Sequence, residues 1–163
     1  DGSMVSQVGD GFVGRNIQET QLNTPSNHRS VYLPIVRGLV PESLSLFDFS
    51  DPSLLSGKRE VTTVPSQALY LMNSDFAINS AQAMAEYLVK EQKLKGPELA
   101  KAAFYLCYSR PPTQEEGIHT RAYIERFLEV AKAENLSVEK SRYMALTTFC
   151  QSLISSAEFR YLN

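Results

Sequence analysis

The sequence is poor in the residues from which metal and redox sites are built. Among 163 residues there are two cysteines and two histidines, with neither a Cys-x-x-Cys pair nor a Cys-x-x-Cys-His haem-attachment motif. A zinc site takes about four cysteine, histidine or acidic ligands, whereas Cys107, Cys150, His28 and His119 lie far apart along the chain. We therefore predict that the chain holds no metal and no other cofactor.

A strong charge of either sign is also lacking. Lysine and arginine number 16 against 18 acidic residues, which gives a net charge of −2 and an isoelectric point near 5.7. Nucleic-acid-binding domains concentrate positive charge, so we expect no nucleic-acid partner. No apolar run approaches the roughly 20 residues that span a bilayer, so we expect no membrane insertion by this chain. Its glycine-rich opening leads us to expect an internal piece of a longer protein.

The two parts of the chain differ in composition. Residues 1–64 carry most of the glycine and proline, and they hold two short apolar runs at residues 31–36 and 44–47. Runs of this length fit a short helix or an extended segment equally well. We expect an irregular arm with one or two short helices, packed on a helical core formed by residues 65–163. Together the two parts would make one domain.

The second part carries the sequence signals of five helices. Pro65 suits a first helical turn, and Asn73 or Ser74 can cap the helix that follows. Glu86 and Lys90 are spaced for an ion pair on that helix. The apolar stripes expected to face the core are Ala77, Ala81, Met84 and Leu88; Leu99, Ala102, Ala103 and Leu106; Ile124, Phe127, Leu128 and Ala131; and Tyr143, Leu146, Phe149, Cys150, Leu153 and Ala157.

The later helix boundaries are equally well marked. Gly96 separates the second helix from the third, which must end near Arg110 because two prolines follow it. Thr113 and Glu116 have the spacing of a capping box at the start of the fourth helix, and Ser137 can cap the fifth. The sequence therefore predicts an all-α fold, a bundle-like packing of about five helices with an irregular N-terminal arm.

Several short blocks resemble a family. The blocks are Phe47-Asp48, Arg59, Thr63-Val64-Pro65-Ser66-Gln67-Ala68-Leu69, Leu71-Met72-Asn73 with Phe76, Ser109-Arg110-Pro111-Pro112-Thr113 with Glu116, and Ser155-Ser156-Ala157-Glu158-Phe159. Taken together, over roughly residues 29–161, they are similar to the C-terminal part of a planctomycete-specific domain of unknown function. That domain is found near the C-terminus of large exported proteins, many of which carry a cytochrome-c-like domain upstream. The resemblance implies a cell-envelope setting, periplasmic or at the cell surface, and it supplies no catalytic residues.

Asp48, Asp51 and Arg59 form the most interesting polar cluster. Arginine offers a bidentate fork to an acidic ligand, so the three side chains could line a cleft that binds a sugar or an acidic group. In the more common role, the two aspartates close turns while Arg59 pairs with one of them to fasten the arm. We favour the structural role and keep the three residues as candidate ligand-binding residues.

Gln67 and Asn73 are the other two candidate ligand-binding residues. Both lie in the resembling blocks at residues 63–76, which we call the central block. Around the short helix expected there, helix capping and fastening of the preceding loop are commoner than ligand binding. The tyrosines of the helical part could form a stacking surface for carbohydrate, although core packing is the more usual role at helical spacing.

Three further side chains carry possible chemistry. Cys107 and Cys150 fall within expected helices and could pair as a disulfide in an exported protein, but two free buried thiols are the favoured interpretation. His119 is expected on a solvated helix face. No Gly-x-Ser-x-Gly motif accompanies it, so a serine triad is discounted.

Three functions follow from these observations. The leading one is a non-catalytic accessory domain that docks onto upstream domains of its parent protein or onto a partner in the cell envelope. The second is part of an enzyme or binding site for envelope or algal polysaccharide, with Asp48, Asp51 and Arg59 in the site. The third is a docking partner for a c-type cytochrome. A helix-turn-helix DNA reader ranks last, because no expected helix carries a run of basic residues.

Overall fold

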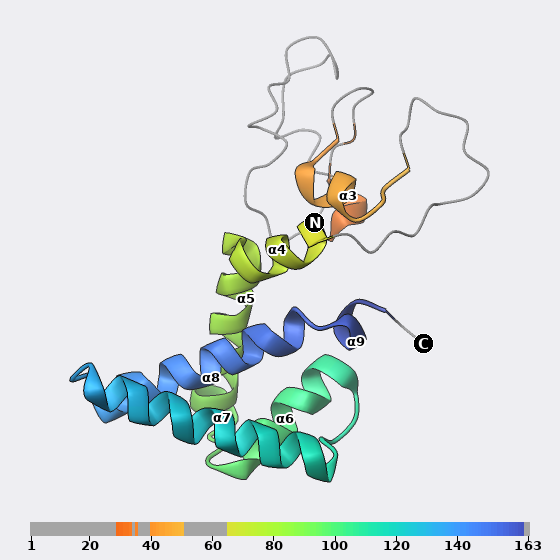
Figure 1. The fold of residues 1–163 in the computed structure, drawn as a ribbon. Coiled ribbons are helices and arrows are strands. Elements are labelled where there is room, and N and C mark those ends of the chain that lie inside the picture. The colour runs from red at the N-terminus through yellow and green to blue at the C-terminus, as the bar shows by residue number, and fades with distance from the viewer. Residues whose placement is uncertain (1–28, 34, 36–39, 51–64, 162–163) are drawn as a thin grey trace. The chain divides into compact units, whose positions relative to one another are not determined.

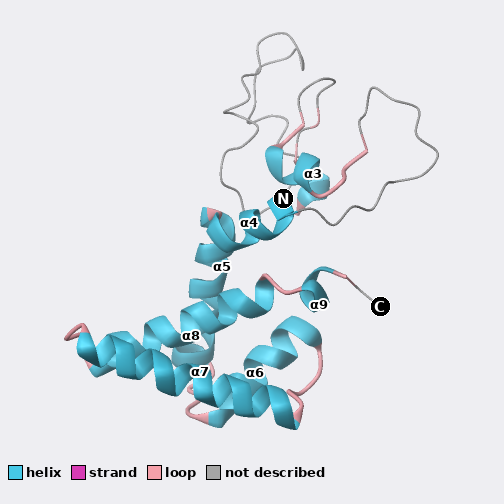
Figure 2. Cartoon of the chain, in the orientation of Figure 1, coloured by secondary structure: helices cyan, strands magenta, loops and turns pink. Residues whose placement is uncertain are grey.

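The computed structural model describes residues 29–33, 35, 40–50 and 65–161, and these residues form helices joined by turns and loops (Figures 1 and 2). Of the residues described, 76% are helical and none lies in a strand, and five of the seven α-helices have seven residues or more. The predicted all-α fold with about five helices is confirmed. The chain forms two compact units, Asp1–Gln67 and Ala68–Asn163.

Two short helical elements lie in the described part of the first unit. A single turn of 3₁₀-helix, η1, covers Ser30–Tyr32, and helix α3 covers Glu42–Leu46. Pro41 precedes α3 and is fully buried. The two apolar runs whose conformation the sequence left open thus contain helical turns at Val31 and Leu44. Packing of the arm on the helical core stays a prediction.

Helix α4, Pro65–Asn73, starts at the proline and is followed after one residue by helix α5, Asp75–Glu86. Between the two candidate caps, the structure selects Ser74, whose extended backbone breaks the helix and whose hydroxyl accepts from the amide of Ala77 at 3.3 Å. Helix α5 continues into a wide helical turn, η2, at Tyr87–Glu91. The expected pair of Glu86 and Lys90 forms at 3.5 Å.

Helix α6, Pro97–Tyr108, lies between two residues with positive φ. Gly96 precedes it with φ +57°, and Ser109 follows it with φ +58° in the left-handed region. The expected end before Pro111 is therefore confirmed. One stripe residue was assigned wrongly: the side chain of Leu106 faces solvent, with 53% exposure, and Phe104 is buried in its place. In a helix these positions lie 200° apart, so the inner face includes Phe104 and Cys107.

Helix α7, Gln114–Ala133, begins at the predicted capping box. The Thr113 hydroxyl accepts from the amide of Glu116 at 3.2 Å, while a Glu116 carboxylate oxygen accepts from the amide of Thr113 at 2.7 Å. The helix ends with Asn135 in the left-handed region, where the next amide, that of Leu136, donates back to Ala131 at 3.1 Å.

Helix α8, Val138–Ile154, is capped by Ser137 as predicted and is followed by the short helix α9, Ala157–Arg160. The expectation that Ala157 extends the inner face of the fifth helix is wrong. The serine pair after Ile154 interrupts the helix, because Ser156 adopts an extended backbone and caps a new helix through its hydroxyl. Ala157 is consequently exposed.

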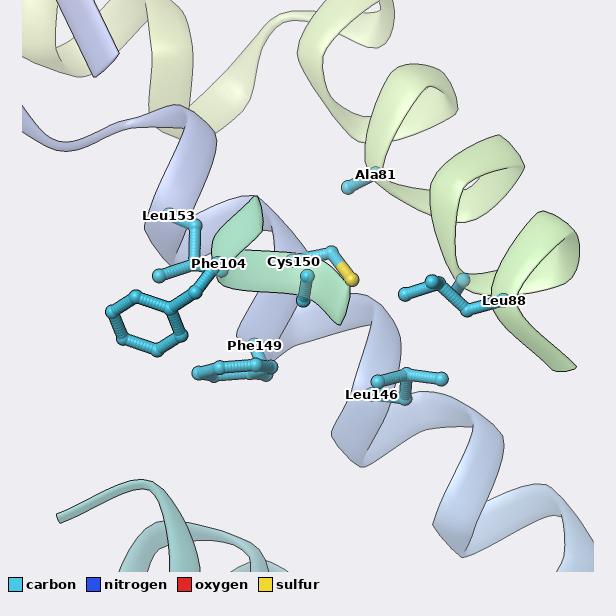
Figure 3. Close-up of a cluster of buried hydrophobic side chains, with 9 residues drawn as sticks. Ala81, Leu88, Phe104, Leu146, Phe149, Cys150 and Leu153 are labelled. Carbon is cyan, nitrogen blue, oxygen red and sulfur yellow. The ribbon is translucent and has the colours of Figure 1, made fainter. Parts of the chain in front are cut away.

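Helix α8 lies at the centre of the second unit and contacts α5, α6, α7 and α9. Helices α7 and α8 lie side by side in Figure 1. The core, shown in Figure 3, is formed by α5 with η2, by α6 and by α8. Its buried side chains are Ala81, Ala85, Leu88, Ala103, Phe104, Leu146, Phe149, Cys150 and Leu153. None of the helices that the structure describes combines the length and apolar character that a bilayer crossing requires.

Candidate functional site

The predicted polar cluster is only partly described. Asp48 follows α3 in the left-handed region, with φ +58°, and its carboxylate lies 3.5 Å from the side-chain amide of Gln67. Asp51 and Arg59 lie outside the described residues. The favoured structural role of these three side chains and the alternative, a ligand-binding site, both stay predictions.

Gln67 ties two elements of the first unit together. Its side chain is almost fully buried, with 2% exposure. Its amide nitrogen donates to the carbonyl of Leu46 at 3.0 Å and approaches Asp48. A buried amide needs such partners, and here they fasten the end of α3 to the first turn of α4. A further contact of Gln67 with a ligand stays a prediction.

Asn73 is bound within its own helix. Its side-chain nitrogen donates to the carbonyl of Leu69 at 2.8 Å, one turn earlier in α4 and already part of the i to i+4 ladder of that helix. Two of the carbonyls left open at the end of α4 are satisfied from α8 and the turn that follows it: Gln151 donates to Met72 at 2.8 Å, and Ser155 donates to Leu71 at 3.1 Å. The end of α4 is thus fixed by side chains about 80 residues later in the chain.

An arginine that sequence reasoning left without a role joins three elements of the second unit. Arg110 donates from Nε and Nη2 to both carboxylate oxygens of Glu158, each at 2.7 Å. It also donates from Nη1 and Nη2 to both oxygens of Glu116, each at 2.8 Å. These are two bidentate pairs on one guanidinium, the strongest geometry for this pairing. We call Arg110, Glu116 and Glu158 the arginine clamp.

The arginine clamp is supported by α6. The guanidinium of Arg110 lies 5.7 Å from the ring centre of Phe104 and 5.4 Å from that of Tyr108, within cation–π range. The Tyr108 hydroxyl in turn donates to Ser156 at 2.9 Å, and that serine caps α9. The end of α6, the start of α7 and helix α9 are therefore held by one connected set of contacts.

The arginine clamp shifts the protonation of its members. Hydrogen bonds from Arg110, together with those from Thr113, lower the pKa of Glu116 to about 2. Arg110 likewise lowers the pKa of Glu158, and the two carboxylates raise the pKa of the guanidinium further. All three groups stay charged at neutral pH, so they bind one another and are poorly suited to proton transfer.

The remaining candidates, two cysteines and one histidine, all lie in the second unit. Cys107 and Cys150 are free, and burial raises their pKa values to about 11 and about 12, which keeps both as unreactive thiols at neutral pH. The His119 side chain is 75% exposed, as expected, and lies 3.8 Å from Glu115. Across the described ranges, no three histidine, cysteine or acidic side chains gather as metal ligands would.

Large apolar side chains of the central block face solvent. Leu69, Met72 and Phe76 are 57%, 58% and 59% exposed, all within residues 69–76. We call these three residues the central-block apolar surface. From the sequence, only the polar residues of this block were considered as candidates, and its exposed apolar side chains were not predicted. The available signal was the density of large apolar residues beyond those the inner stripes require.

These contacts define the second unit as a helical domain built around α8, with its last helix fastened by an arginine and two glutamates. The chain belongs to the PSD1 family, proteins of unknown function (DUF1553), whose family model matches residues 2–124. This confirms the expected membership in a family of unknown function. The match includes Arg110 and Glu116 and ends within α7, so Glu158 lies beyond it. No curated protein and no solved structure matches the chain.

Proposed function

We propose that this chain is a non-catalytic accessory domain that docks onto other domains of a larger exported protein. The observation that carries the proposal is the central-block apolar surface, in which Leu69, Met72 and Phe76 are each more than half exposed. These three residues lie within eight positions of the chain, and a concentration of exposed large apolar side chains is typical of a surface that a partner covers. The polar residues of the same block, by contrast, bind their own fold.

The polar contacts support a docking role over a catalytic one. The Gln67 amide donates to the end of α3, and the Asn73 amide donates within α4. The most strongly ionised carboxylates, Glu116 and Glu158, are occupied by Arg110. Within the second unit, the bonds from Gln151 and Ser155 to the carbonyls of Met72 and Leu71 hold the end of α4, which carries part of the central-block apolar surface. A preorganised surface binds its partner at a lower entropic cost.

The proposed partner is the upstream part of the same parent protein. The blocks at residues 47–76 resemble a planctomycete-specific domain of exported proteins, many of which include a cytochrome-c-like domain. This resemblance supports a cell-envelope location and makes a domain of that kind one candidate partner. A polysaccharide site around Asp48, Asp51 and Arg59 is the competing function.

The test compares two triple variants of the chain for binding to the separately purified upstream domains by isothermal titration calorimetry. In one variant Leu69, Met72 and Phe76 are changed to serine. In the control, the equally exposed Leu106, Ile118 and Val138 are changed to serine. We expect the first triple to weaken binding by about tenfold or more, because truncating apolar anchors typically costs over 1 kcal/mol, while the control binds normally.

Two results would overturn the proposal. One is wild-type affinity for the upstream domains in the first triple variant. The other is a saturable thermal shift with an envelope or algal polysaccharide that is lost in Arg59→Ala, which would assign the chain to carbohydrate binding. A ligand present at about 100 times its dissociation constant stabilises a fold by about 2.7 kcal/mol, so such a shift is readily measured.

A further inference from the structure

A second apolar surface lies along helix α7, in the second unit. It is a shallow groove of about 320 Å³. Its apolar wall includes Tyr123 and Val130, which are 40% and 59% exposed. Two charged side chains, Arg126 and Glu134, also line it. We call the groove and these side chains the α7 flank.

The spacing of the α7 flank is symmetric about one residue. Arg126 precedes Val130 by four positions and Glu134 follows it by four. Positions four apart in a helix are neighbours on one side, one turn from each other. Val130 therefore lies midway between a positive and a negative side chain, with about 12 Å of helix axis between the two charges.

Neither charge is neutralised by another described residue of the chain. Some charged residues of α7 have partners, as Arg121 does in Glu125 at 3.3 Å. Within the described ranges no ion pair or side-chain hydrogen bond involves Arg126 or Glu134. The two charges are therefore available to an occupant of the groove.

We propose that the occupant is the α7 flank of a second copy of this chain, packed antiparallel about a two-fold axis at Val130. Such an axis sets residue 126 of one copy opposite residue 134 of the other, and the reverse. Two equivalent ion pairs then form, each between Arg126 of one copy and Glu134 of the other. The two Val130 side chains meet at the centre. A two-fold interface requires this self-complementarity, and a parallel arrangement would instead oppose like charges.

The aromatic wall of the α7 flank is already fixed in position. The Tyr123 hydroxyl is bonded to the hydroxyl of Thr148 on α8 at 2.6 Å, and the ring of Tyr123 lies 6.3 Å from that of Phe127. Side chains held in this way lose little rotamer freedom on association. One helix flank buries less than the roughly 1,200 Å² of a standard interface, so we infer a weak dimer whose population rises with protein concentration.

The experiment is sedimentation equilibrium of the full chain over a wide concentration range, with charge reversals as variants. Arg126→Glu and Glu134→Arg each bring like charges together twice, so each is expected to weaken dimerisation by about tenfold or more. The double variant Arg126→Glu with Glu134→Arg restores both pairs with their polarity exchanged and is expected to dimerise like the wild type. Lys95→Glu and Glu91→Arg, which are exposed outside the α7 flank, serve as matched controls.

The rescue by the double variant distinguishes pairing across the axis from a general effect of net charge. A chain that stays monomeric at every concentration would overturn the proposal. A dimer that both single reversals leave intact, or that the double variant fails to restore, would also overturn it. Because these residues lie outside the central-block apolar surface, failure here leaves the proposed docking onto upstream domains standing.

Discussion

Helices α7 and α8 lie side by side, yet they are held in the second unit in different ways. The longer helix, α7, has 20 residues and buries two of them, Thr120 and Ala131. Helix α8 has 17 residues and buries Ser141, Ala145, Leu146, Phe149, Cys150 and Leu153. The difference follows from position, because α8 has neighbours on several sides whereas α7 packs mainly on α8. Length alone therefore does not indicate which helix organises the core.

Helix α7 buries few side chains, and polar contacts at its N-terminal end hold it in place instead. Glu116 accepts from the amide of Thr113 and from Arg110 at once, so the capping box and the arginine clamp share one carboxylate. Arg110 extends this contact to Glu158 on α9. Burial fixes α8 along its length, whereas hydrogen bonds and ion pairs fix the beginning of α7.

The largest expected effect tests whether buried side chains stabilise α8 more than α7. Phe149 on α8 is 5% exposed, and Phe149→Ala should lower the free energy of unfolding by about 3–5 kcal/mol through lost burial and a cavity. Val130 on α7 is 59% exposed, and Val130→Ala should change the free energy of unfolding by less than about 0.5 kcal/mol. Urea unfolding followed by circular dichroism measures both values. Equal costs for the two variants would contradict the distinction.

The next effect concerns the arginine clamp. Arg110→Ala removes both bidentate pairs and leaves two carboxylates close together, so the melting temperature should fall by less than in Phe149→Ala but by more than in a cap variant. Arg121→Ala, which breaks an exposed pair on α7, should leave the melting temperature almost unchanged. A similar loss in both variants would show that the arginine clamp is an ordinary surface ion pair.

The arginine clamp also predicts a pH dependence. Because Arg110 and Thr113 hold the pKa of Glu116 at about 2, below its ordinary value of 4.5, the folded state binds this proton more weakly than the unfolded state. The stabilisation is complete above about pH 4.5 and is lost as the pH falls towards 2. Glu116→Gln keeps an oxygen acceptor for the capping box and removes the charge.

The melting temperatures of wild type and Glu116→Gln should therefore differ most at pH 7 and converge as the pH falls from 4.5 to 2. Differential scanning calorimetry at several pH values measures this convergence. A difference that is independent of pH would mean that the charge of Glu116 has no part in holding the start of α7.

The helices could be predicted from the sequence because their signals are local. Pro65, Ser137 and the capping box at Thr113 each act within one turn, and the structure confirms all three. The clamp contact between Arg110 and Glu158 could not be predicted in this way, since the two residues are 48 positions apart and each taken alone is a surface charge. Two of the resembling blocks, at residues 109–113 and 155–159, contain these residues and were the available signal.

The errors and the open questions also have physical causes. Leu106 was placed inside because its spacing fits a helical stripe, but the same helix offers Phe104 on the face that meets α8. The stripe through Ala157 ignored the serine pair that ends α8. Tertiary packing decides the first case and local capping the second. The roles of Asp48, Asp51 and Arg59, structural or ligand-binding, depend on residues beyond those described and stay predictions.

A smaller effect tests the capping box itself. Thr113→Ala removes the hydroxyl that accepts from the amide of Glu116, and the free energy of unfolding should fall by about 1 kcal/mol. Ser137→Ala at the start of α8 removes the equivalent bond to Lys140 and should cost a similar amount or less. Urea unfolding of both variants gives the comparison. A larger cost at Ser137 would mean that α7 depends on its cap no more than α8 does.

The smallest effect concerns Ser109, which joins the end of α6 to the arginine clamp. Its φ of +58° lies in the left-handed region, where glycine carries no steric penalty and a side chain does. Ser109→Gly should therefore raise the free energy of unfolding by about 0.5–1 kcal/mol. The same replacement within α8, Ser152→Gly, should lower it by up to about 1 kcal/mol, because glycine is unfavourable inside a helix. Opposite signs are thus expected for one chemical change at two sites. A loss of stability in Ser109→Gly would mean that the serine restrains the approach of Arg110 to Glu116, which would add this residue to the contacts that hold the start of α7.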